Sequence, residues 1–130
     1  MNTSKLMAAA LTSLLIIAAS GASTAWAHHG WRWTESGVFE LTGVVESARL
    51  GNPHGVLVVD ADGQKWTVEV GQPWRNERAG LTDKMLAPGA ELTILGKRSA
   101  DAAEQRMKAE RVVIDGTNHD LYPERIEASR

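Results

Sequence analysis

The stretch GVLVVDADGQKWTVEV, residues 55–70, contains two short apolar runs separated by an Asp-Gly pair. In its second half, apolar and polar residues alternate with the period of two that a half-buried strand requires. Asp62 and Gly63 form one of the strongest short-range signals for a tight hairpin turn. The stretch therefore predicts a β-hairpin whose strands are residues 55–60 and 64–70.

Three further segments have the composition of strands. Residues 38–50 precede the hairpin, and residues 90–98 and 106–116 follow it. Gly43 interrupts the first of these segments, where it predicts a bulge or a bend. The chain is thus expected to contain five strands.

The segment between the hairpin and the last two strands, residues 71–89, is expected to be partly helical. Pro73 can begin a helical turn, and Gly80 can end it. Thr82 can cap a second short turn that stops before Pro88. The predicted order is therefore three strands, a helical connection and two strands.

This order favours an all-β fold with one short helical connection, a five-stranded OB-fold-like Greek-key barrel over residues 38–116. A β-sandwich is the main alternative, although it normally has about seven strands. Barrels of this kind bind ligands on the second and third strands and in two nearby loops. One of those loops, residues 50–55, carries His54, and the other, residues 97–105, has no histidine.

Residues 1–27 have the features of a secretory signal peptide. Lys5 supplies a positive charge, residues 6–19 are almost entirely apolar, and Ala25 and Ala27 form an A-x-A cleavage site. The alternative is a retained N-terminal anchor, which the clear cleavage site disfavours. We therefore expect an exported protein, periplasmic or secreted, whose mature chain begins with His28.

The expected mature chain is long enough for one domain, with an N-terminal arm over residues 28–37 and a C-terminal tail over residues 117–130. It holds all 16 acidic residues and 13 of the 14 basic ones, so its net charge is −3 with neutral histidines. This charge argues against nucleic-acid binding, which normally requires a basic surface. The absence of cysteine excludes a lipoprotein and any disulfide.

Several short motifs resemble a family of small exported bacterial proteins catalogued as a domain of unknown function. The motifs are AHHGW (27–31), LTGVV (41–45), NPHG (52–55), WTVEVGQP (66–73) and LAPGAELTILGKRSAD (86–101). Gly51 and Leu81 depart from the resemblance, because family members often have aromatic residues at these two places. The resemblance implies no activity.

The most specific of these motifs contain His28, His29 and His54, and together they predict a metal site. A neutral imidazole binds transition metals well, and the α-amine of His28 could close a chelate ring with its own Nδ1. His54 would be the third ligand, with His29 competing for that place. Asn52 would shape the loop with Pro53 or support the ligands from behind. Three nitrogens without cysteine favour Cu(II), and the mature start is similar in this respect to the histidine brace of secreted copper oxygenases.

Each histidine also has an interpretation without metal. His28 and His29 could be a solvated chain end, and His54 could simply shape its turn. His119, after the last predicted strand, is expected to be solvent-exposed.

The four tryptophans of the expected mature chain predict a core and a covering arm. Trp66 lies on the inward alternation of its strand, and Trp74 is expected to close one end of the barrel. Trp31 and Trp33 point the same way in an extended segment. They either pack the arm onto the barrel or form an apolar surface for a small ligand or a membrane-protein partner.

The sequence contains no catalytic triad, carboxylate pair or phosphate-binding loop, which favours binding over catalysis. The leading hypothesis is an exported protein that binds copper. The alternative is a metal-free envelope module that docks a small ligand or a membrane-protein partner through the aromatic arm and the barrel loops.

Overall fold

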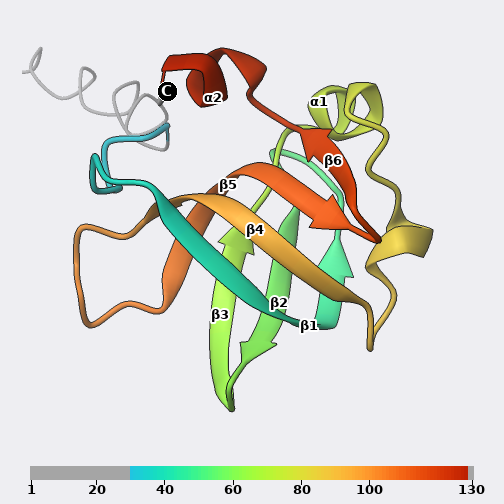
Figure 1. The fold of residues 1–130 in the computed structure, drawn as a ribbon, viewed down its shortest axis with the longest axis horizontal. Helices are drawn as coiled ribbons and strands as arrows, with labels where there is room; N and C mark the ends of the chain where they lie inside the picture. The colour runs from blue at the N-terminus through green and yellow to red at the C-terminus, as the bar shows by residue number, and fades with distance from the viewer. Residues whose placement is uncertain (1–29, 129–130) are drawn as a thin grey trace, which may run out of the picture. The chain divides into compact units, whose positions relative to one another are not determined.

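The computed structural model describes residues 30–128, which form a closed β-barrel with short helices (Figure 1). The strands are β1 (Phe39–Arg49), β2 (Val56–Ala61), β3 (Gln64–Glu69), β4 (Glu91–Arg98), β5 (Arg106–Ile114) and β6 (Thr117–Asp120). The helices are α1 (Pro73–Arg78), the 3-10 helix η2 (Asp83–Leu86) and α2 (Pro123–Ala128). The expected leader and the histidines at 28 and 29 lie outside the described residues. No helix within residues 30–128 has the length and apolar character that crossing a bilayer requires.

The strand β1 is long enough to pair with two strands, which begins the ring of the barrel. Its first half is antiparallel to β4 and its second half is antiparallel to β2. The β2–β3 hairpin and the antiparallel β4–β5 pair complete the ring through a parallel contact between β3 and β5. The predicted five-stranded barrel, with a helical connection between the third and fourth strands, is confirmed.

The predicted turns and caps also have the expected geometry. Asp62 and Gly63 adopt φ values of 53° and 80°, the left-handed conformation that a tight two-residue hairpin turn requires. Pro73 begins α1, and the side chain of Thr82 accepts a hydrogen bond from the Met85 amide at the start of η2. Local sequence therefore determines where this connection starts and stops.

A bulge or a bend was expected at Gly43; the β1–β2 register shift lies instead at Glu46, between Val45 and Ser47. Gly43 has a different role, because a Cβ at this position would lie 2.3 Å from the carbonyl oxygen of Asp60. It lies next to Val44, the residue at which β1 changes partner from β4 to β2. Glycine thus permits the close approach of two backbones at the bend.

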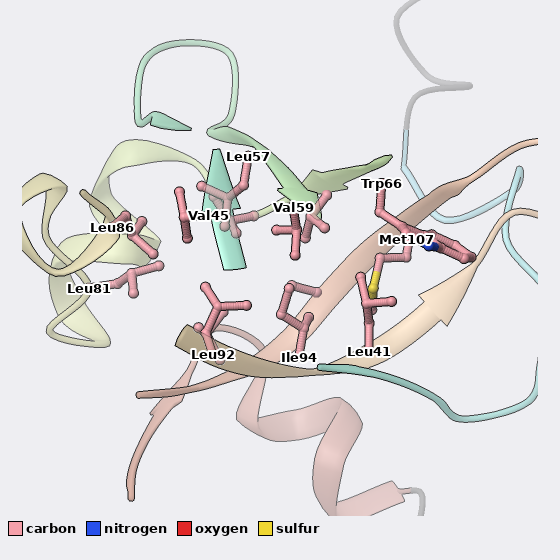
Figure 2. Packing of buried hydrophobic residues seen from close by; sticks show 14 of the residues in the cluster. Leu41, Val45, Leu57, Val59, Trp66, Leu81, Leu86, Leu92, Ile94 and Met107 are labelled. Atoms are coloured by element: carbon pink, nitrogen blue, oxygen red, sulfur yellow. The ribbon is translucent and has the colours of Figure 1, made fainter. Parts of the chain in front are cut away.

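The core runs through the barrel from one end to the other. Figure 2 shows the leucine side chains at 81, 86 and 92 at one end and Trp66 near Met107 at the other. Trp66 is 7% exposed, and its ring centroid lies 5.1 Å from that of Phe39. The prediction that Trp66 belongs to the core is confirmed.

Trp74 does not close the barrel, contrary to the expectation. Its side chain is 52% exposed, and the guanidinium groups of Arg75 and Arg78 lie 4.6 and 5.1 Å from its ring centroid. Leu81 and Leu86 fill that end of the core instead. Compact aliphatic side chains fit this end, whereas the indole gains cation–π contacts on the outer surface of α1.

The segment expected as a C-terminal tail forms β6 and α2. A second Asp-Gly turn, Asp115–Gly116 with φ values of 49° and 74°, folds β6 back onto β5. His119 is consequently buried, with 6% exposure, and its Nδ1 lies 2.9 Å from the carbonyl oxygen of Ala79. The expectation that His119 is solvent-exposed was wrong, because this turn brings it against the end of α1.

Replacing Trp66 by alanine should lower the free energy of unfolding by about 3–5 kcal/mol, because a large buried ring is lost and a cavity remains. Trp74→Ala is the matched control and should cost about 1 kcal/mol or less, since an exposed cation–π contact is weak. Urea unfolding of both variants measures the difference. Equal losses would contradict the assignment of the two rings.

Candidate functional site

A buried carboxylate lies at the end of β3. Trp66 and Val68 point into the core, so strand alternation directs Glu69 to the outer face of the barrel. Glu69 is nevertheless only 3% exposed. A buried carboxylate requires charged or hydrogen-bonding partners, and the neighbouring elements supply them.

The first partners come from β5, which runs parallel to β3. Met107 and Ala109 point into the core, so Arg106 and Lys108 share the outer face with Glu69. The guanidinium of Arg106 donates two hydrogen bonds to Glu69 Oε2, from Nε at 2.9 Å and from Nη2 at 2.5 Å. Lys108 is opposite Glu69 in the parallel register and is itself 7% exposed. The β3–β5 contact therefore places two cations around one carboxylate.

The third partner is His54, from the loop between β1 and β2. Gly55 extends the β2–β3 pairing, because its amide donates to the Gly71 carbonyl and its carbonyl accepts from the Val70 amide. His54 therefore precedes a paired stretch and lies on the same outer face as Val56, whose cross-strand partner is Glu69. His54 Nε2 lies 2.6 Å from Glu69 Oε1.

The protonation of His54 follows from these surroundings. Burial lowers the pKa of His54, and the positive charges of Lys108, Arg106 and Arg49 lower it further, whereas Glu69 opposes the shift. The imidazole is therefore neutral at pH 7. Since Nε2 contacts a carboxylate oxygen, Nε2 carries the proton, and Nδ1 keeps its lone pair. The side chain of His54 is 26% exposed.

The N-terminal arm covers the cations of β5. Thr34 forms a β-bridge with Ser99, and the Ala100 amide donates to the Trp33 carbonyl. The Trp33 ring centroid lies 3.9 Å from the Arg106 guanidinium, and the Trp31 ring centroid lies 4.8 Å from Lys108 Nζ.

These contacts confirm the interpretation in which Trp31 and Trp33 pack the arm onto the barrel. Two tryptophans spaced by two residues lie over two cations with the same spacing. Burial beneath the arm lowers the pKa of Lys108, and Glu69 partly offsets that shift.

The structure brings His54 together with residues that sequence reasoning missed, namely Glu69, Arg106 and Lys108. Their strands alternate apolar and charged residues, a pattern that normally indicates a solvated outer face. Only the arm and the parallel pairing, both long-range features, turn that face into a buried ionic cluster.

The other loop residues singled out from sequence stand apart from this cluster. Asn52 and Pro53 are exposed, the bond between them is cis, and the Asn52 side chain makes no hydrogen bond within the described residues. Across residues 30–128 no three side chains of His, Cys, Asp or Glu lie close enough to hold a metal ion on their own. A metal at His54 would therefore need ligands from elsewhere.

The stability of the metal-free protein should fall more steeply between pH 7 and pH 5 than that of His54→Gln. Folding lowers the pKa of His54 below its ordinary value of 6.5, so the unfolded chain binds this proton more readily. The stability linked to His54 is complete above pH 6.5 and is lost as the pH falls through the lower pKa of the folded state. Urea unfolding at several pH values tests this, and parallel curves for the two proteins would contradict it.

The comparison with known families gives one match. The profile of the "Family of unknown function (DUF6152)" matches residues 16–108. The matched region includes the expected histidine start, the loop with His54 and the residues Glu69, Arg106 and Lys108. No curated protein matches the chain.

Proposed function

Because the chain belongs to the family of unknown function DUF6152, whose description names no activity, we propose a function from its residues. The protein is an exported, periplasmic or secreted binding protein that holds Cu(II) between its N-terminal histidines and His54. The observation that carries this proposal is the contact of 2.6 Å between His54 Nε2 and the buried carboxylate oxygen Oε1 of Glu69.

This contact supports a ligand role for His54. Metal-binding histidines usually donate their second ring N–H to a carboxylate or carbonyl, which orients the ring and makes the ligating nitrogen more basic. Glu69 Oε1 lies 2.6 Å from His54 Nε2, where it can accept such a bond, and Arg106 holds the carboxylate in place from its other oxygen. The result is a neutral imidazole with a free lone pair on Nδ1, the form that binds transition metals.

The remaining ligands would come from the expected mature N-terminus. His28 would chelate through its α-amine and ring, and His29 would compete with His54 for the third place. His29 precedes Trp31 by two residues, a contour of about 7 Å. Trp31 lies against Lys108, the residue that is opposite Glu69 across the parallel strands. Trp31, two residues after His29 in the sequence, thus lies on the same outer face as His54.

The metal-free alternative has weaker support. It uses Trp31 and Trp33 as a docking surface, but cations of the protein already cover both rings. Arg106 lies over Trp33, and Lys108 and Arg125 lie over Trp31. A partner would have to displace these contacts.

An additional N-terminal residue should sharply weaken Cu(II) binding. Signal-peptide cleavage would leave the α-amine on His28, whereas an added methionine converts that amine to an amide and removes the chelate ring. Calorimetric Cu(II) titration at neutral pH compares the protein isolated after export with the version carrying the extra methionine. Affinity should also fall in acid, because protons compete for the amine and the imidazoles. Equal affinities for the two versions would reject the amine as a ligand.

Glu69→Gln should lower Cu(II) affinity by roughly 10–100-fold, since it weakens the bond that orients His54. His54→Gln should lower it at least as much. Glu91→Gln, an exposed residue at the start of β4, is the matched control and should leave the affinity unchanged. Thermal unfolding of each metal-free variant establishes that it is folded. If folded Glu69→Gln and His54→Gln bind Cu(II) like the wild type, the copper site does not include this pair.

A further inference from the structure

A second candidate site lies between the arm and parts of β4, β5 and α2. A hollow of about 690 Å³ is lined by the arm, by Lys97 of β4, by Glu110 of β5 and by Arg125 of α2. Its volume lies within the range of about 300–1,000 Å³ found for small-molecule sites. Among the described residues of the proposed copper site, neither His54 nor Glu69 lines it.

A β-bulge directs Glu110 toward this hollow. Across β4, Leu95 pairs with Arg111 and Gly96 pairs with Ala109, so Glu110 has no partner in that ladder. Ala109 and Val112 both point into the core, and the two residues between them therefore turn outward. The carbonyl of Glu110 accepts hydrogen bonds from the amides of Leu121 and Tyr122, which lead into α2.

The carboxyl group of Glu110 lacks a partner of its own. The residue is 3% exposed, and its Oε1 is buried without a hydrogen bond. Among residues 30–128 no cation forms an ion pair with it. An unpaired buried carboxylate is costly, so a native structure that keeps one has a use for it.

The other charged groups around the hollow have partners. Glu35 pairs with Arg98 at 3.3 Å, and Lys97 Nζ donates to the Ser36 carbonyl at 2.9 Å. The Arg125 guanidinium lies 3.7 Å from the Trp31 ring centroid. Glu110 is therefore the lining group that most needs a positive partner.

We propose that this hollow binds a small organic molecule through a primary ammonium group, which donates hydrogen bonds to the carboxylate of Glu110. A metal ion is a poorer fit, because no group of three His, Cys, Asp or Glu side chains exists among the described residues. The volume also exceeds what a single ion requires and suits an organic molecule.

Benzylamine is the probe, titrated into the EDTA-treated protein and followed by calorimetry. Binding should saturate, and Glu110→Gln should weaken it by roughly tenfold or more, because a charged hydrogen bond becomes a neutral one. Glu40→Gln, an exposed glutamate on β1, is the matched control and should leave the affinity within about twofold of the wild type. Benzyl alcohol, which has the same ring without the charge, should bind roughly tenfold more weakly or not at all.

A second measurement locates the probe and does not depend on any variant. Benzylamine should shift the amide NMR signals of Ser36, Lys97 and Glu110 and leave those of the hairpin at Asp62 unchanged. Absence of saturable binding, equal affinity for folded Glu110→Gln, or shifts only outside the hollow would each overturn the proposal.

Discussion

The carboxylate of Glu69 organises the outer face of the barrel. It is buried at 3% exposure, and such a charge is tolerated only when its desolvation is offset by close partners. Arg106 holds one oxygen with two hydrogen bonds, and His54 contacts the other. Lys108 adds a second positive neighbour across the parallel strands. Removing the carboxylate would leave these cations facing one another in a partly buried layer.

The aromatic arm completes this arrangement. Cations that are turned away from water need a favourable environment, and the faces of indole rings provide one. Trp33 lies over Arg106, Trp31 lies over Lys108, and Tyr122 meets Trp31 edge to face at 4.9 Å. Cation–π and ring contacts on the outer face therefore hold together the arm, β5 and the segment before α2. These contacts are separate from the apolar core inside the barrel.

Two features of the sheet position the residues of the proposed sites: the parallel pairing of β3 with β5 and the bulge in β5 at Glu110. Parallel pairing of β3 with β5 closes the barrel and brings Glu69 beside Lys108. The bulge at Glu110 then rotates the rest of β5, so that Val112 returns to the core while Glu110 and Arg111 face outward. Arg111 is paired with Asp120 of β6, whereas the carboxyl group of Glu110 faces the hollow with no ion-pair partner among residues 30–128. One strand thus contributes to two separate charged environments.

Local sequence determined much of the fold. The alternation over residues 64–70, the Asp62–Gly63 turn, Pro73 and the Thr82 cap all act over a few residues, so they predicted the hairpin, the helical connection and the five-stranded barrel. The same turn signal occurs at Asp115–Gly116, where it folds β6 back onto β5. The expected C-terminal tail did not include this strand, and the burial of His119 was therefore not predicted.

Only the tertiary structure decided which polar residues are buried. In the sequence, Glu69, Arg106 and Lys108 look like the solvated side of ordinary amphipathic strands. The burial of Glu69 and Lys108 and the partial covering of Arg106 depend on strand closure and on an arm that folds across β5, contacts between residues far apart in the chain. His54 could be identified from sequence as a candidate ligand, but its carboxylate partner could not, because periodicity reports which face a residue occupies and not what covers that face.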